Sequence, residues 1–344
     1  MTAWSIVVGA LGFGLAYVNG ANDVSKGIAT LVGSGVTDYR RAIRWGALWT
    51  TAGALLAAGL ARAMVGTFGS GILAVGTAPT FAAAAATLAG AALWVLFATR
   101  TGLPVSTTHA IVGAIVGVAS VAYGVEGVRW GALGAKILVP LLVSPLVALA
   151  AVVILVRVAP RARPPLAGAA GARVSCAAER PHALRLTLDH LHWLTSGATS
   201  FARGLNDAPK IVALLLAASA LAGPGVLSQA PALFALVAGG MLAGSLTAGR
   251  RVTRVLAVRV TSMGHRQGFV ANLVISALVT AGATLGLPMS TTHVASGGII
   301  GAGARRASLN RRTLRDLALA WAVTLPASAA LGVAAYAVGS WAAP

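Results

Sequence analysis

Long stretches without a charged side chain dominate the hydrophobic pattern of the chain. Four of them cover residues 63–99, 211–249, 267–304 and 317–344. A helix needs roughly 20 apolar residues to cross the hydrocarbon core of a bilayer, so several of these stretches must contain more than one membrane element. Their residues do not alternate between apolar and polar, as the strands of a membrane β-barrel would. The pattern therefore predicts an all-α, polytopic protein embedded in a lipid bilayer.

Two motifs occur twice along the chain at one common separation. Residues 20–26 read GANDVSK and residues 204–210 read GLNDAPK, while residues 102–109 read GLPVSTTH and residues 286–293 read GLPMSTTH. Both pairs are 184 residues apart. Two different motifs at the same separation indicate a tandem duplication.

The duplication divides the chain into two membrane repeats, residues 1–157 and 188–344, joined by a linker at 158–187. The linker is basic and contains prolines, which is typical of a surface loop. Each repeat contains five apolar segments, at about 4–34, 45–61, 76–98, 103–120 and 133–156 in the first and about 188–221, 229–249, 266–282, 287–304 and 317–341 in the second.

Five is an odd number of segments per repeat. If each segment crosses the bilayer once, the second repeat enters from the opposite side, which predicts two inverted-topology repeats, as in many secondary transporters. Ten crossings are then expected. A re-entrant hairpin at a broken segment would lower that number without moving the loops.

The charges are unbalanced, with 26 lysines and arginines against 7 acidic residues and a formal net charge of +19. Most bases are arginines grouped between apolar segments, and aromatic residues do not alternate with them as on a nucleic-acid platform. We therefore expect no nucleic-acid partner. Loops that follow odd-numbered segments hold 20 bases, and those on the other side hold three. The positive-inside rule places the basic loops in the cytoplasm and both termini outside, in the cytoplasmic membrane.

Few ionisable side chains remain at membrane depth once the loops are set aside. They are Asp23, Lys26, Arg203, Asp207 and Lys210. Charges at this depth are costly, and they usually mark a transport pathway. The alternative is that the two Asp–Lys pairs, each spaced i,i+3, are structural ion pairs that hold neighbouring helices together.

The sequence around Asp207 predicts an interrupted helix. Pro209 has no backbone N–H and is best tolerated in a first helical turn, and Asn206 and Asp207 before it are favourable N-cap residues. We therefore expect half-helices that begin near Ala208 and, by symmetry, near Val24, with the charged motif at a break at the membrane midplane.

The second motif also predicts half-helices, which begin after Pro104 and Pro288. The first turn of a helix offers unpaired N–H groups and the positive end of the helix dipole, which together attract anions. Hydroxyl groups in these turns add donors for an oxyanion; they belong to Ser106, Thr107, Thr108, Ser290, Thr291 and Thr292. His109 and His293 come next and either support the site from behind or serve as packing residues. Two isolated histidines, in a chain with one cysteine, do not predict a metal centre.

At these motifs the chain resembles the PiT family of inorganic phosphate transporters, which carries a duplicated GANDVAN-type signature on broken helices and a PVSTTH element downstream. The resemblance covers nearly the whole chain. It implies a secondary active symporter of inorganic phosphate, usually a homodimer, with inverted repeats, outward termini, no resident cofactor and no enzymatic activity. By motif position, Asn22, Asp23, Asn206 and Asp207 would line the cation and anion sites, and the six hydroxyl residues would bind the oxyanion.

The chain departs from the family pattern at the end of each signature, where Lys26 and Lys210 replace the usual asparagine. An ammonium cannot offer an oxygen to sodium, and at 4 Å it would repel the ion by about 4 kcal/mol at an effective dielectric of 20. The lysines suit an anion, and the carboxylate of Asp23 or Asp207 can accept a proton. We therefore predict proton-coupled uptake with both lysines in the anion site. Sodium bound at Asp23 and Asp207 is the alternative.

Arg203 is a second departure, because its partner in the first repeat is Asn19. It lies four residues before Asp207, and we expect it to support the site without contacting the substrate; the predicted break leaves a direct pair with Asp207 open. Three other functions remain open: the same fold carrying sulfate or another tetrahedral oxyanion, an intramembrane hydrolase, and an open channel. The hydrolase is disfavoured because the serines do not lie on a G-x-S-x-G turn.

Overall fold

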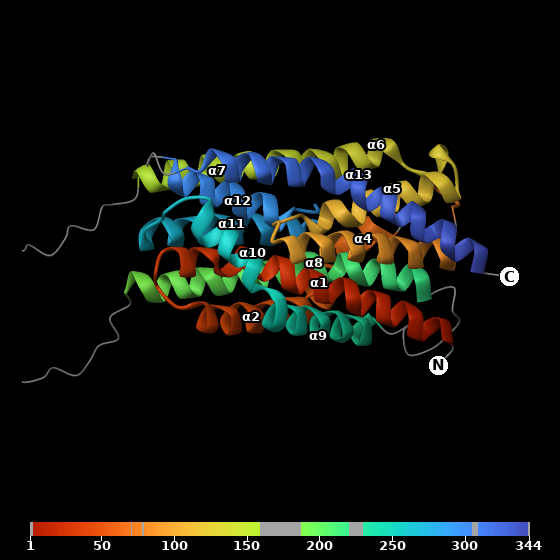
Figure 1. Ribbon diagram of the computed structural model, residues 1–344, viewed down its shortest axis with the longest axis horizontal. Coiled ribbons are helices and arrows are strands. Elements are labelled where there is room, and N and C mark those ends of the chain that lie inside the picture. The colour runs from red at the N-terminus through yellow and green to blue at the C-terminus, as the bar shows by residue number, and fades with distance from the viewer. Residues whose placement is uncertain are drawn as a thin grey trace, which may run out of the picture.

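The apolar segments of the sequence form helices at the places that the pattern predicts. Figure 1 shows the computed structural model, which describes residues 3–69, 71–77, 79–158, 187–219, 230–304 and 309–342. Within these ranges the chain is helical between short connections, and no strand forms apart from an isolated bridge between Leu73 and Val128. The predicted linker lies outside the described residues except at its two ends.

The two repeats contain their long helices in the same order, with different short helices between them. The first contains α1 (Ala3–Gly33), α2 (Tyr39–Leu60), α3 (Arg62–Gly69), α4 (Phe81–Thr101), α5 (Thr107–Ala122), η1 (Val125–Gly127), α6 (Trp130–Leu133), η2 (Gly134–Leu138) and α7 (Val139–Val158). The second contains α8 (Leu188–Ser219), α9 (Ala230–Ala248), α10 (Arg250–Arg254), η4 (Val255–Arg259), α11 (His265–Thr284), α12 (Thr291–Gly303) and α13 (Arg311–Ala342).

Several of these helices are suited to cross a bilayer. Among the described residues, α4, α6 to α7, α9, α11 and α13 are long and apolar enough, and α2 with α3, bent by 80°, forms a sixth candidate. The helices α1 and α8 are longer, at 31 and 32 residues, but charged side chains interrupt their apolar sequence. The chain is therefore a multi-pass helical membrane protein.

The pairs α4–α5 and α11–α12 form hairpins that enter from opposite ends. In Figure 1 α4 and α5 lie towards one end of the long axis of the molecule, and α11 and α12 towards the other. Their tips meet between them, where Ser290 Oγ donates a hydrogen bond of 2.8 Å to Ser106 Oγ. Gly102 and Gly286 open the two connecting segments with φ of 79° and 69°, a conformation that glycine adopts without strain. This explains why both GLP motifs begin with glycine.

The hairpins correct the expected number of crossings. Although α4 and α11 have the length and composition of a span, each ends at the contact between the tips, and α5 and α12 return from there, so ten single crossings are not formed. In each repeat we assign the remaining elements to three spans: α1, α2 with α3, and α6 with α7 in the first, then α8, α9 with α10 and η4, and α13 in the second. Three is also odd, so the inverted topology is retained.

The two repeats interlock. The hairpin α4–α5 of the first repeat packs against α13 of the second, and the hairpin α11–α12 packs against α7 of the first. Glycines allow this contact: a Cβ on Gly113 of α5 would meet the Leu325 backbone of α13, and one on Gly297 of α12 would meet the Pro145 backbone of α7. Each hairpin is therefore covered by a helix of the other repeat.

The predicted breaks near Val24 and Ala208 do not occur, since α1 and α8 run through both positions. Pro209 lies inside α8, and membrane helices tolerate proline when surrounding groups replace the missing hydrogen bond. The motif glycines have a packing function instead. A Cβ on Gly20 would meet the Met241 backbone of α9, and one on Gly204 would meet the Thr50 backbone of α2.

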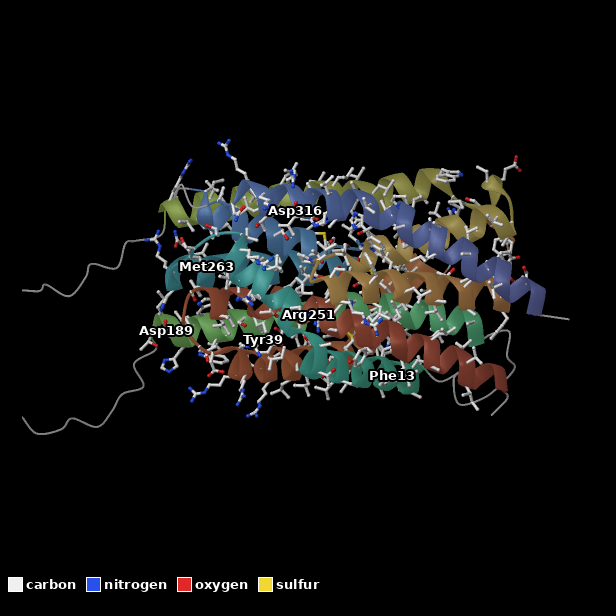
Figure 2. The ribbon with its side chains drawn as sticks, in the orientation of Figure 1. Phe13, Tyr39, Asp189, Arg251, Met263 and Asp316 are labelled. Carbon is white, nitrogen blue, oxygen red and sulfur yellow. The ribbon has the colours of Figure 1, made fainter. Side chains whose placement is uncertain are left out.

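A second correction concerns arginines that the sequence pattern places in cytoplasmic loops. Arg100 is one residue from the end of α4, close to the hairpin tip, and Arg250, Arg251 and Arg254 form most of α10. Figure 2 shows Arg251 well inside the length of the molecule. Asp189 and Met263 lie near the end where α7 stops and α8 starts, which we call the basic face. These arginines reach membrane depth because α9 ends before the basic face and α10 continues from there.

Candidate functional site

Polar side chains of α1 and α8 form one buried layer opposite the hairpin tips. They are Asn19, Asn22, Asp23 and Lys26 on α1 and Arg203, Asn206, Asp207 and Lys210 on α8, and none is more than 3% exposed. Both sets have the spacing i, i+3, i+4, i+7, which places them on one face of a helix. The sequence predicts all of these residues as site residues except Asn19.

Asp23 and Lys26 form an ion pair on α1. The Lys26 Nζ atom is 2.6 Å from Asp23 Oδ1, 2.7 Å from Asn22 Oδ1 and 2.9 Å from the Asn22 carbonyl oxygen. An ammonium has three N–H groups, and here each has an acceptor on the same helix. Lys26 therefore has no N–H left for an anion in this conformation.

Asp207 and Lys210 form the equivalent pair on α8, but with different partners. Lys210 Nζ lies 3.2 Å from Asp207 Oδ1, and it donates to Thr108 Oγ1 at 2.6 Å and to the Met289 carbonyl at 3.1 Å. Two of its three hydrogen bonds thus go to the hairpin tips. The predicted contact between lysine and anion could form at Lys210 if the tips moved away. At Lys26 the ammonium group would first have to give up its acceptors on α1.

The second oxygen of each aspartate faces the centre, where Asn19 lies between them. Asn19 Nδ2 is 3.4 Å from Asp23 Oδ2, 3.3 Å from Asp207 Oδ2 and 3.1 Å from Thr107 Oγ1. The hydroxyls of Thr107 and Thr291 donate to Asp23 Oδ2 at 3.3 and 3.4 Å. Asn19 thus belongs to the site. The only sequence signals for it are its position four residues before Asp23 and its equivalence to Arg203.

Arg203 lies beside Asn19. Its Nη1 atom is 3.5 Å from both Asn19 Oδ1 and the Asn19 carbonyl, and its Nε donates to Thr50 Oγ1 at 3.2 Å. Its Nη2 atom is buried with no hydrogen-bond partner among the described residues. An N–H facing Oδ1 holds the Asn19 amide with its nitrogen towards the carboxylates. Arg203 therefore lies behind Asn19.

Equivalent residues of the two repeats meet at the centre of the molecule. Positions 19 and 203 are in contact, Ser290 Oγ donates to Ser106 Oγ, and the His109 and His293 rings are 4.4 Å apart. Contact between equivalent residues means that the approximate two-fold axis of the duplication passes through this layer. Asn19 and Arg203 break that symmetry, since they are chemically different.

The hydroxyl residues of the tips have three separate functions. Ser106 and Ser290 are N-caps, whose Oγ atoms accept the backbone N–H of His109 and His293 at 3.2 and 3.1 Å. Thr107 and Thr291 face the carboxylates. Thr108 and Thr292 connect one tip to the other through the Met289 and Val105 carbonyls, at 3.4 and 2.7 Å. In this conformation most hydroxyls hold the tips together.

The first turns of α5 and α12 retain donors suited to an anion. Within the described part of the chain, four backbone N–H groups of these turns have no acceptor; they belong to Thr107, Thr108, Thr291 and Thr292. Such groups carry the positive end of the helix dipole. Two half-helices thus direct their positive ends into one buried space, next to two ion-paired aspartates.

The motif asparagines fasten the tips to the long helices. Asn22 Nδ2 donates to Thr99 Oγ1 at 3.1 Å and to the Leu103 carbonyl at 3.0 Å, and its Oδ1 accepts the Val105 N–H at 3.3 Å. Asn206 Nδ2 donates to the Met289 carbonyl at 2.9 Å. Both side chains therefore contact tip backbone.

The two histidines lie behind the tips. The His293 ring is 4.0 Å from the Trp321 ring of α13, and His109 Nδ1 and His293 Nε2 are buried without a hydrogen-bond partner among the described residues. Across the described ranges, no three His, Cys, Asp or Glu side chains lie close enough to hold a metal ion. The histidines pack on each other and on an aromatic ring.

Known proteins are similar to this chain over most of its length. A protein of Rhizobium meliloti, named as a probable low-affinity inorganic phosphate transporter, is 30% identical over 349 residues, which cover 97% of this chain and 96% of that protein. Inorganic phosphate transporter 2-1 of Arabidopsis thaliana, a chloroplast protein, is 28% identical over 413 residues, with 94% of this chain and 70% of that protein covered.

A solved structure of a protein described as a sodium-dependent phosphate transporter has the same fold. Its TM-score to this chain is 0.83 at 23% sequence identity, with 99% of this chain and 100% of that chain covered. The sequence model of the phosphate transporter family matches residues 19–332, which include both copies of each motif. The chain belongs to the phosphate transporter family.

Proposed function

We propose that the protein is a symporter that takes up inorganic phosphate across the cytoplasmic membrane, with protons as the coupling ion. The observation that carries this proposal is the pair of opposed half-helix N-termini beside two buried Asp–Lys pairs. As a member of a transporter family, the chain moves its substrate rather than converting it, and it needs no resident cofactor.

Phosphate binding requires the two tips to separate. An oxyanion between them would accept the free N–H groups of the Thr107–Thr108 and Thr291–Thr292 turns, and it would replace the Ser106–Ser290 bond. Lys210 would exchange its bonds to Thr108 and Met289 for phosphate oxygens. The threonine hydroxyls released from the opposite tip would complete the set of donors.

Alternating access follows from the position of the hairpins. Each hairpin reaches the centre from one end of the molecule and packs on a helix of the other repeat. If one hairpin moves away from its covering helix, the site opens towards that end only. The duplication thus supplies two equivalent gates to one site.

Proton coupling is assigned to Asp23 and Asp207. Their Oδ1 atoms are paired with lysines, while their Oδ2 atoms face the centre. Asp207 Oδ2 accepts only the Asn19 amide among the described residues and can take a proton without moving a helix, whereas Asp23 Oδ2 must first release one of its three donors. Sodium is the second candidate, because Asp23 Oδ2, Asp207 Oδ2 and the Thr107 and Thr291 hydroxyls form a group of oxygens that a hard cation could use.

The first prediction concerns the substrate. In proteoliposomes, labelled phosphate should accumulate in a saturable manner. An excess of unlabelled phosphate should suppress this accumulation, and the same excess of sulfate should not. A protonated phosphate offers a hydrogen-bond donor to the central Asp oxygens, and fully ionised sulfate has none. Equal competition by sulfate would instead assign the protein to general tetrahedral oxyanion transport. Linear, non-saturable flux would indicate a channel.

The second prediction concerns orientation in the membrane. The arginine distribution predicts outward termini, so the η1 segment, on the same side as the N-terminus in Figure 1, should face outside. In a Cys176→Ala background, a cysteine at Glu126 should react with an impermeant thiol reagent on intact cells, and one at Arg311 should not. The reverse pattern would contradict the proposed orientation.

The homodimer that the family resemblance implies can be tested by light scattering in detergent.

A further inference from the structure

A large cavity lies beside the central site on the side of the basic loops. Its volume is about 970 Å³, and its walls come from α1, α2, α4, α9, α10 and η4. Among the lining side chains are Tyr39, Thr99 and four arginines: Arg100, Arg250, Arg251 and Arg254. In Figure 2 the labelled Tyr39 and Arg251 lie close together in the view, on this flank of the molecule. We name this cavity the arginine vestibule.

The charged side chains of the vestibule are all arginines. Among the described residues that line it there is no aspartate or glutamate. Arg251 is partly engaged, since its Nη1 donates to the Arg100 carbonyl at 2.7 Å. Arg250 and Arg254 are exposed and make no hydrogen bond or ion pair with the described residues. Charged groups at membrane depth that have no protein partner face water, so these guanidinium groups are available to a solute.

The floor of the vestibule is joined to the central site. Thr99, one of its lining residues, accepts the hydrogen bond from Asn22 Nδ2, and Asn22 in turn accepts Lys26 Nζ. Two hydrogen bonds in series, Thr99–Asn22 and Asn22–Lys26, therefore connect the cavity wall to the Asp23–Lys26 pair. The vestibule is thus adjacent to the central site on the side of the basic loops.

We propose that the arginine vestibule is a second oxyanion site, which binds phosphate between the central site and the cytoplasm. This inference rests on the proposed phosphate transport and on the proposed orientation. A cleft lined by charges of one sign raises the local concentration of a counter-charged solute, and guanidinium groups match the geometry of phosphate oxygens. The affinity of this site for phosphate determines the cytoplasmic phosphate concentration at which the exit path is half-occupied.

The experiment compares two variants that each lack two arginines. R250Q/R254Q removes two vestibule charges without breaking a side-chain hydrogen bond to the described residues, and R40Q/R44Q removes two exposed charges at the start of α2, outside the vestibule. In proteoliposomes, phosphate–phosphate exchange is measured with the basic face or the opposite face exposed to varied phosphate. R250Q/R254Q should raise the half-saturating concentration at the basic face by about tenfold and leave the opposite face unchanged, and R40Q/R44Q should change neither.

An unchanged half-saturating concentration at the basic face, or an equal change at both faces, would overturn the vestibule assignment.

A second readout does not depend on transport. In the Cys176→Ala background, Ala248→Cys places a thiol in the vestibule wall, where an anionic thiol reagent should react faster than a cationic one and inorganic phosphate should slow both. Adding R250Q/R254Q should remove the preference for the anionic reagent. If the preference and the protection are present while labelled phosphate is not transported, the proposed function fails and the site stands; if both are absent, the site fails.

Discussion

Asparagine in place of Asp23 or Asp207 should reduce coupled phosphate uptake by at least about a hundredfold, which corresponds to about 3 kcal/mol. Each carboxylate holds a buried ammonium through Oδ1 and faces the centre through Oδ2. The amide carries no charge and takes up no proton, so the variant loses both the pairing with lysine and the group assigned to coupling. Initial rates of labelled phosphate uptake in proteoliposomes provide the measurement.

Two controls separate the transport function of these aspartates from their structural one. Asp38→Asn alters an exposed N-cap whose carboxylate accepts the Arg40 and Arg41 N–H groups; those backbone bonds lower the pKa of Asp38, and asparagine caps a helix equally well. It should transport normally. D207N/K210M removes both charges of one pair and leaves no unpaired ammonium. If the double variant is folded and transports at the normal rate, the Asp207–Lys210 pair is structural and takes no part in coupling.

The sequence predicts the tips well because their geometry is set by local chemistry. Pro104 and Pro288 precede serines that cap the next helix, and Gly102 and Gly286 supply the positive φ that ends the previous one. Each of these effects acts within a few residues. The common separation of the motifs then predicts that the tips are equivalent, although their direct contact depends on packing.

The sequence predicts the long helices less well, because their breaks depend on tertiary structure. Pro209 and the Asn–Asp dipeptide favour a helix start, yet α8 continues, since the Asn206 and Asp207 side chains bind a tip and a lysine rather than backbone N–H groups. A crossing and a re-entrant hairpin also have the same apolar pattern. For this reason the segment count predicts the inverted topology but not the number of spans.

Asn19 and the arginine vestibule have no local signature. A single asparagine in an apolar helix is unremarkable by sequence, and Asn19 gains its position from Asp23, Asp207 and Arg203, which come from two helices. Arg251 resembles a loop arginine in sequence because it follows an apolar segment. It lies at depth only because α9 is short and α10 continues beside α1 and α4.

Protons rather than sodium should drive uptake, and the orientation of Asn19 is the reason. Its Nδ2 atom occupies the space between Asp23 Oδ2 and Asp207 Oδ2, and the Arg203 guanidinium faces its Oδ1. A sodium ion in this space would need the amide reversed, with Oδ1 towards the ion and an N–H towards a guanidinium. The buried charges add to this cost, since three cations face two carboxylates, and each repulsion at 4 Å is about 4 kcal/mol at an effective dielectric of 20. A proton on Asp207 Oδ2 requires no such reversal.

In proteoliposomes free of sodium, an inward proton gradient should therefore accumulate phosphate, and a protonophore should abolish the accumulation. An inward sodium gradient at matched pH should not drive it. Arg203→Asn makes position 203 identical to its repeat partner, which removes one buried cation and frees the Asn19 amide to turn. This variant should acquire stimulation by sodium that the native protein lacks, whereas Arg44→Asn, an exposed arginine outside the site, should not. Strict sodium dependence of the native protein would show that the Asn19 amide turns during transport, so that its oxygen joins Asp23, Asp207 and the two threonine hydroxyls around the ion.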